Sequence, residues 1–190
     1  MKKIFVVLLL GLFLGGCGDD SAKCDNKIAL ETLGNLLKNG ISNSYNSNFS
    51  YESYNKKILQ NRDIIRQSQN DFRLYLDKDV KIKFSNFRTQ KKDEFSCGCT
   101  AKIEFIFPEP PDSVRTTQEI YAELRGDGFW EGNQFIANRY PLNLSFLSQG
   151  LQTTFNETKE IDDVIYFVTL TDDKKQVYTR FVNIGMGYLK

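Results

Sequence analysis

The segment "FSCGCTAKIEFIF", residues 95–107, alternates more regularly than any other part of the chain. Apolar residues and cysteines occupy every second position and share one face of an extended chain: Phe95, Cys97, Cys99, Ala101, Ile103, Phe105 and Phe107. Small and polar side chains fill most of the positions between them. A period of two predicts a β-strand with one dry face. That face must be covered by another element, so the stretch predicts a sheet packed on one side.

Other strands are expected on both sides of this one. Val80, Ile82 and Phe84 alternate with polar residues, and a polar turn over 88–94 would join them to the central strand as a hairpin. Proline-rich residues 108–111 end the central strand, because proline cannot donate to a ladder.

The rest of the chain predicts two more antiparallel pairs. Residues 163–170 and 176–184 form a strand, a turn at 172–175 and a strand. Between the prolines and this hairpin, the alternation of Ile120, Ala122 and Leu124 predicts a strand that turns at 126–128 into an antiparallel partner. Residues 141–155 are expected to form a helical turn or a long loop.

Helices are expected before the strands. Asp25 or Asn26 can cap a helix that runs to Asn39 and ends at Gly40. Its apolar face combines four residues at helical spacing: Ala29, Leu33, Leu36 and Leu37. A Ser/Asn-rich loop over 41–55 would lead to a second helix over 54–76. Helices first and strands afterwards predict an α+β fold, with one or more N-terminal helices packed on an antiparallel sheet in a single domain over 25–190.

The N-terminus has the pattern of a secretion signal. Lys2 and Lys3 precede an apolar run over 4–14, which is too short to cross a bilayer as a helix, since that needs roughly 20 apolar residues. The sequence Leu-Gly-Gly-Cys at 14–17 then resembles the lipobox of bacterial lipoproteins.

This resemblance implies a cellular address. Residues 1–16 would be a cleaved signal peptide, Cys17 would carry acyl chains such as palmitate, and residues 17–24 would be a short polar tether. Gly18 after the lipidated cysteine favours the outer membrane, so the chain is expected in the cell envelope, facing the periplasm. Two or three acyl chains suffice for stable anchoring.

Composition excludes several functions. Removal of Lys2 and Lys3 with the signal peptide takes the formal net charge from +1 to −1, which gives no electrostatic basis for nucleic-acid binding. The chain contains no histidine, so it lacks the usual general base and the His-dependent triads and zinc sites. A Ser-x-x-Lys match at 53–56 lies in a Ser/Asn-rich stretch without a partner motif. We therefore expect no enzyme and no cofactor.

The three remaining cysteines predict one disulfide. Cys97 and Cys99 lie two positions apart on one strand face, about 6.6–6.8 Å between Cα atoms, and cannot pair with each other without breaking the strand. Cys24 can pair with either of them if the first helix crosses the dry face, which would stabilise the fold by about 4 kcal/mol. The alternative is a three-thiolate site for Cu(I) or Zn. We expect no metal, because the face is apolar.

A second resemblance concerns the mature chain. A cysteine before the first helix, "VKIKFSNFRT" turning into "CGCTAKIEF", and the last hairpin "IYFVTLTDDKKQVY" resemble small bacterial lipoproteins with a cystatin-like or nuclear-transport-factor-2-like fold. The insert over 108–160 departs from that pattern. The resemblance implies that Cys99 pairs with Cys24, which leaves Cys97 as a buried thiol, and that the domain is a binding or assembly module.

These observations predict a non-catalytic lipoprotein that binds an envelope protein, for assembly, inhibition or toxin immunity. The alternative is a binder of a small molecule or lipid on the sheet face. Phe129 and Trp130 are neighbours beside a Gly-rich turn, so on a strand one of them is expected to be exposed as an anchor for a partner.

Overall fold

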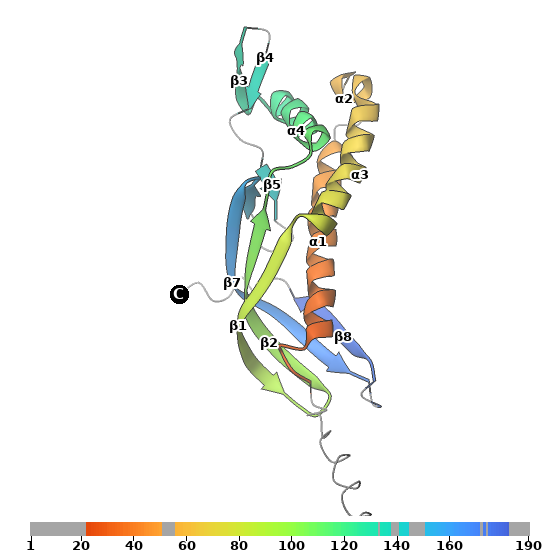
Figure 1. The fold of residues 1–190 in the computed structure, drawn as a ribbon, viewed down its shortest axis with the longest axis vertical. Helices are drawn as coiled ribbons and strands as arrows, with labels where there is room; N and C mark the ends of the chain where they lie inside the picture. Colours follow the sequence, from red (N-terminus) through yellow and green to blue (C-terminus); the bar gives the residue numbers. More distant parts are fainter. Residues whose placement is uncertain are drawn as a thin grey trace, which may run out of the picture.

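The computed structural model describes residues 22–50, 56–132, 134–137, 141–144, 151–171, 173 and 175–182. Within these residues the fold is α+β, with helices against one face of an antiparallel sheet, as predicted (Figure 1). The expected signal peptide and Cys17 lie outside the described residues, as does the serine of the Ser-x-x-Lys match.

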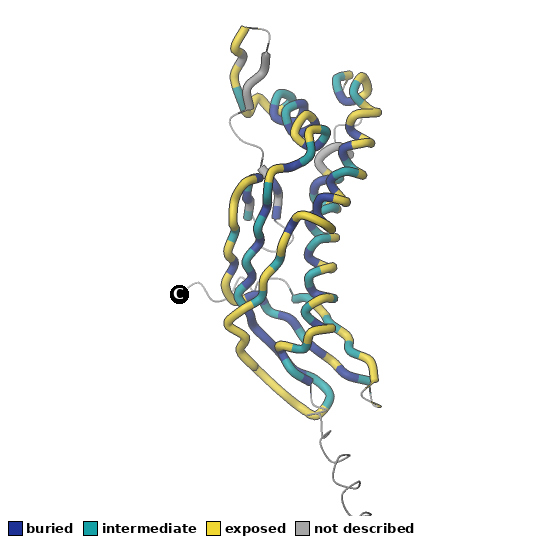
Figure 2. The backbone as a smooth tube through the Cα atoms, viewed as in Figure 1, coloured by how far each residue is buried: buried dark blue, intermediate teal, exposed yellow. Residues whose placement is uncertain are grey.

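The main sheet has four strands: β1 (Lys81–Lys92), β2 (Ser96–Phe107), β7 (Glu157–Leu170) and β8 (Val177–Val182). Their order is β1-β2-β7-β8, and all neighbours are antiparallel. β2 is therefore central, and every dry-face residue predicted for it from Cys97 to Phe107 is buried. Figure 2 shows the buried residues along β2 and β7 and on the helix sides that face them, whereas most of β1 is exposed.

β1 is longer than the sequence predicted. A turn was expected over 88–94, but β1 continues to Lys92 and β2 begins at Ser96. The turn therefore occupies only residues 93–95. The Asp93 carboxylate accepts hydrogen bonds from the backbone N–H groups of Phe95 and Ser96, at 3.0 and 2.6 Å, and so closes a tight turn that needs few residues. The Ser96 hydroxyl donates a further hydrogen bond to this carboxylate at 2.7 Å, and this bond, together with the two backbone bonds, lowers the pKa of Asp93.

The ladder contains three irregularities. Two register shifts lie in β1, between Ser85 and Arg88 and between Thr89 and Lys91, and the third lies between Ala101 and Ile103 in the β2–β7 pairing. Asn86, with φ 53°, and Asp163, with φ 56°, adopt left-handed conformations at the first and third of these places. Bulges of this kind bend a strand and increase its twist, and regular pairing at the start of β1 ends with Ser85.

The first helix, α1 (Lys27–Ser50), begins where the sequence predicted but ends later than predicted. The Asn26 side chain accepts a hydrogen bond from the Ala29 N–H at 3.1 Å, as expected of a cap. The helix does not stop at Gly40, because its buried stripe continues through Ile41 and Tyr45, which are 1% and 2% exposed. Burial of these side chains outweighs the roughly 1 kcal/mol that a helical glycine costs. The predicted loop is thus helical over 41–50.

Two more helices follow, α2 (Lys56–Gln60) and α3 (Arg62–Lys78), where one helix was predicted over 54–76. α1 and α3 lie side by side on the same side of the sheet (Figure 1). Tyr45 of α1 stacks on Phe72 of α3 with 4.1 Å between ring centroids, and its hydroxyl hydrogen-bonds Ser68. Burial raises the pKa of the Tyr45 phenol. Aromatic packing of this kind closes the core above the sheet.

The strand predicted at 120–124 is wrong. These residues belong to a helix, α4 (Asp112–Arg125), which follows Pro111 and ends at Gly126 in a left-handed conformation with φ 72°. Val114, Gln118 and Tyr121 are buried at helical spacing, while the alternation of residues 120, 122 and 124 is accidental. The predicted turn leads instead into a hairpin of β3 (Gly128–Glu131) and β4 (Gln134–Ala137).

The segment over 141–155 is neither a helical turn nor a plain loop. β5 (Pro141–Asn143) and β6 (Gln152–Thr154) form a short antiparallel pair. The molecule is elongated, with the β3–β4 hairpin at one end and the turn between β1 and β2 towards the other (Figure 1). Of the insert expected over 108–160, α4 and the β3–β4 hairpin lie beyond one end of the main sheet (Figure 1).

Candidate functional site

A disulfide joins Cys24 to Cys99, with 5.5 Å between the Cα atoms and a sequence separation of 75. This is the pairing that the resemblance to cystatin-like lipoproteins implied. Cys97 is a free buried thiol, again as expected. The bond fixes the chain just before α1 to the centre of the sheet, on the dry face of β2.

All three sulfur atoms form one cluster. The Cys97 Sγ lies 3.0 Å from the Cys24 Sγ and 3.4 Å from the Cys99 Sγ. The three ligand atoms thus lie within 4.8 Å of one another, as a thiolate metal site requires. Two of these sulfur atoms are already bonded to each other, so they cannot act as thiolate ligands while the disulfide stands.

The surroundings of the cluster are those of a structural clamp. All three cysteines are buried, and the Tyr166 hydroxyl donates a hydrogen bond to the carbonyl oxygen of Cys24. Burial raises the pKa of the Tyr166 phenol, so this donor stays protonated. The cluster therefore secures the entry to α1 and offers no site for a substrate from solution.

An open groove lies beside this clamp, between α1 and β1. It has a volume of about 710 Å³. Its apolar lining comes from Leu30 and Gly34 of α1 and from Ile82 and Phe84 of β1. Polar and charged residues line the remainder: Asp25, Lys27, Glu31, Asn35 and Lys38. Ile82 and Phe84 are only half-buried, unlike the fully buried Val80 that precedes them.

The position of α1 over the sheet leaves this groove open. α1 lies close to β8, where the Thr179 hydroxyl donates a hydrogen bond to the Ala29 carbonyl at 3.2 Å. β1 is at the opposite edge of the sheet, so the helix leaves the β1 side less covered. Gly34 leaves room for a methyl group here, because a Cβ at this position would lie 4.0 Å from the nearest atom of Phe84, which is an ordinary van der Waals contact.

The edge of β1 is itself unpaired. β1 pairs with β2 alone among the strands of the described part of the chain. An edge strand presents backbone N–H and C=O groups that a further strand can bind. β1 is also basic, with lysines and arginine at positions 81, 83, 88, 91 and 92 and no acidic residue.

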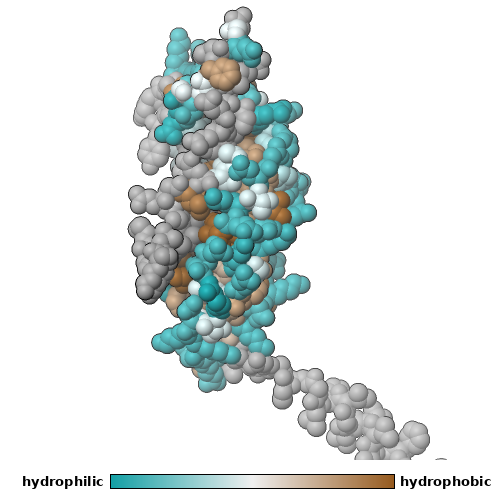
Figure 3. Space-filling view, turned by 90° about the vertical axis from the view of Figure 1, so that its left-hand side faces the viewer, coloured by the Kyte–Doolittle hydropathy of each residue, from teal (hydrophilic) through white to brown (hydrophobic). Residues whose placement is uncertain are grey.

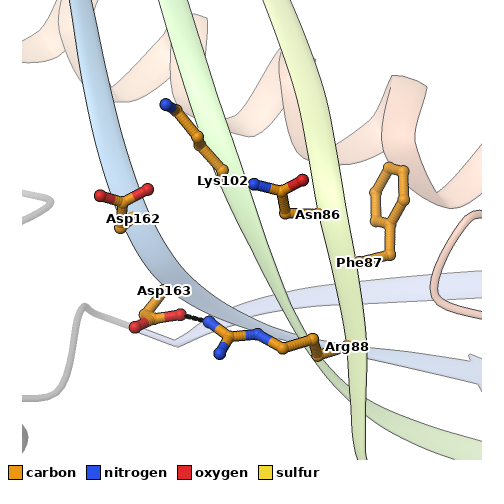
Figure 4. Close-up of a pocket in the computed structure, with 6 residues that line it drawn as sticks. All are labelled: Asn86, Phe87, Arg88, Lys102, Asp162 and Asp163. Carbon is orange, nitrogen blue, oxygen red and sulfur yellow. Dashed lines mark ion pairs between the residues drawn. The ribbon is translucent and has the colours of Figure 1, made fainter.

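A second pocket opens on the sheet face away from the helices (Figure 4). It has a volume of about 490 Å³ and is lined by Asn86, Phe87, Arg88, Lys102, Asp162 and Asp163. Arg88 forms an ion pair with Asp163, and Lys102 donates to Glu160 at 2.6 Å, which raises the pKa of Lys102. Figure 3 shows this side of the molecule, on which hydrophobic atoms lie among the hydrophilic ones. The charges of Arg88 and Lys102 are thus paired with carboxylates at the surface. We therefore interpret this pocket as part of a solvated sheet face rather than as a binding site.

The structure describes only one of the two side chains of the predicted aromatic anchor, Phe129 and Trp130. Phe129 is 54% exposed on β3, as expected for one of the two neighbours. The side chain of Trp130 lies outside the described residues. The β3–β4 hairpin stands at the end of the molecule, away from the groove (Figure 1), so the two features are separate. A binding role for Phe129 and Trp130 stays a prediction.

Comparison with known proteins yields no relative: no family model, no curated protein and no solved structure matches the chain. Among the described residues, no helix combines the length and apolar character needed to cross a membrane.

Proposed function

We propose that this protein is a lipid-anchored, non-catalytic module of the cell envelope that binds a segment of a partner protein in the groove between α1 and β1. The main support for the proposal is that β1 is an edge strand and that it lies beside a groove with an apolar lining of Leu30, Ile82 and Phe84. Proteins recognise extended peptides in this way, since the strand edge supplies hydrogen bonds and the groove takes alternate side chains.

The disulfide clamp supports a binding role for this region. Cys24 is tied to β2, so the first turns of α1 are held in place next to β1. A groove whose walls are fixed in advance loses little entropy when a ligand binds. The alternative function, binding of a small molecule or lipid on the sheet face, has less support, because α1 and α3 cover that face with buried side chains such as Leu33 and Phe72.

The proposed anchor would orient the domain. Six residues lie between Cys17 and Cys24, so an acyl chain at Cys17 holds Cys24 within about 25 Å of the bilayer surface. The clamped start of α1 would then face the membrane, and the β3–β4 hairpin would point into the periplasm. The groove runs along the side of the molecule, where a neighbouring envelope protein can reach it.

Site-specific photo-cross-linking in intact cells tests this function. A photoreactive residue replaces Asn35, which is exposed and lines the groove, and in a matched strain it replaces Arg73, which is exposed on α3. We expect one defined protein adduct from position 35 and none of that size from position 73. The same adduct must disappear when Gly34→Leu fills the groove.

Adducts of equal yield from both positions would contradict the proposal, and so would an adduct that survives Gly34→Leu. A photoreactive residue at Phe129 tests the other predicted anchor in the same experiment. An adduct from that position alone would place the partner on the β3–β4 hairpin.

A further inference from the structure

We infer that the segment bound in the groove is a short strand in which apolar and acidic side chains alternate. This inference rests on the proposed function and adds the chemical class of the ligand. It follows from the two faces of the first five residues of β1, Lys81–Ser85, which lie next to α1.

The length of the bound strand is set by β1 itself. Lys81 to Ser85 pair in regular register with β2, and the register then shifts before Arg88, with Asn86 at φ 53°. A bulge bends the strand and interrupts the line of edge groups that an added strand would follow. An added strand therefore pairs with about five residues.

One face of the added strand would be apolar. Ile82 and Phe84 both line the groove, so β1 turns every second side chain towards α1. Residues of a neighbouring strand that lie beside Ile82 and Phe84 point to the same side of the sheet. They would enter the space above Gly34 and contact Leu30. Two apolar side chains in alternate positions fit this space.

The other face would be acidic. Lys81 and Lys83 alternate with the groove-lining residues and point to the other side of the sheet. Both lysines are exposed, and Lys83 reaches Glu104 of β2 at 2.7 Å, whereas Lys81 has no ion-pair partner among the residues that the structure describes. Acidic side chains on an added strand would lie beside these two lysines. Opposite charges on neighbouring strands attract, and like charges repel.

The same charges disfavour a second copy of this chain as the occupant. Two β1 edges placed together would bring basic strands side by side, since residues 81–92 contain no acidic residue. An amphipathic helix fits less well, because a helix satisfies its own backbone groups and would leave the β1 edge unpaired.

The test uses fluorescence anisotropy with the purified mature domain. The probe is a labelled peptide in which three glutamates alternate with two valines. Two control peptides have the glutamates replaced by lysines, or have N-methyl groups on alternate backbone nitrogens so that they cannot pair as a strand. We expect the acidic peptide to bind at least tenfold more tightly than either control.

Protein variants separate the groove from the edge charges. Gly34→Leu should weaken binding of the acidic peptide at least tenfold, while Gly34→Ala, which leaves most of the groove open, should change it less than threefold. Lys81→Glu with Lys83→Glu should weaken the acidic peptide and strengthen the lysine peptide. Circular dichroism confirms that each variant is folded.

Equal binding of the acidic and lysine peptides would overturn the inference, as would undiminished binding of the N-methylated peptide. Absence of binding by the acidic peptide would overturn it too. If the cross-link from position 35 still forms and is still lost in Gly34→Leu, the proposed function stands and only the class of ligand is wrong. Loss of both results would reject the function as well.

Discussion

At the scale of single residues, the cysteine cluster contains an unused bonding partner. The Cys97 Sγ lies 3.0 Å from the Cys24 Sγ. The sequence separation of these two cysteines is 73, and that of the existing disulfide is 75. The two possible bonds thus close loops of nearly the same length, and the stabilisation from loop closure is nearly the same.

We therefore expect Cys99→Ser to form a Cys24–Cys97 disulfide and to remain folded. Mass spectrometry of peptides from the unreduced protein identifies the bond. Cys97→Ser should keep the Cys24–Cys99 bond. Cys24→Ser can form neither disulfide, so it should unfold at a lower urea concentration, and its free energy of unfolding should fall by up to about 4 kcal/mol. Two free thiols in folded Cys99→Ser would show that Cys97 cannot take the place of Cys99.

Gly34 offers a second residue-scale prediction. It lies inside α1, and a methyl group there would meet nothing closer than Phe84 at 4.0 Å. Gly34→Ala should raise the free energy of unfolding by about 1 kcal/mol, because alanine loses less backbone entropy in a helix. Urea denaturation measures the change. A decrease would mean that the groove at Gly34 is tighter than the structure has it.

At the scale of elements, α4 carries an unsatisfied polar side chain. Gln118 is 1% exposed, and neither its amide nitrogen nor its amide oxygen has a hydrogen-bond partner within the described part of the fold. A buried amide without a partner costs roughly 1–3 kcal/mol.

Gln118→Met keeps the shape of the side chain and removes the unpaired groups, so it should stabilise the domain by about 1–2 kcal/mol. Thermal unfolding followed by circular dichroism measures the change, with Thr116→Met at an exposed position of the same helix as the control. A lower melting temperature in Gln118→Met would indicate that the amide has a partner that the fold requires.

The same scale shows which elements the sequence could predict. The alternation of β2 is a local pattern, so the strand and its dry face from Cys97 to Phe107 were predicted correctly, whereas Phe95 lies before the strand and is only half-buried. α1 beyond Gly40 was missed because Ile41 and Tyr45 are held in a helix by tertiary burial, which a glycine stop signal does not reveal. α4 was misread because Ile120, Ala122 and Leu124 also fit a period of two.

The groove could not be predicted from any local pattern. It depends on α1 lying close to β8 and leaving the β1 edge open, which is a matter of how elements pack. A glycine at position 34, four residues after Leu30 in an apolar helix, was the one available signal. For the disulfide, the cysteine spacing left Cys97 and Cys99 as alternative partners of Cys24, and only the resemblance to cystatin-like lipoproteins implied Cys99.

At the scale of the whole molecule, the proposed anchor makes a prediction about location. Cys17→Ser should move the protein from the membrane fraction to the soluble periplasmic fraction, because no acyl chain can then be attached. Fractionation followed by immunoblotting measures the distribution, and Cys97→Ser, which keeps the disulfide, is the matched control that should stay with the membrane. Membrane association of Cys17→Ser would contradict lipidation at this residue.

The most direct test of the account is amide hydrogen exchange in the mature domain, measured by mass spectrometry with and without the acidic alternating peptide at saturation. Binding as an added strand predicts slower exchange in residues 81–85 of β1 and in residues 27–38 of α1, with no change in β3. Protection confined to the β3–β4 hairpin or to β8, or no protection at any of these places, would contradict the central claim that the groove between α1 and β1 binds the partner.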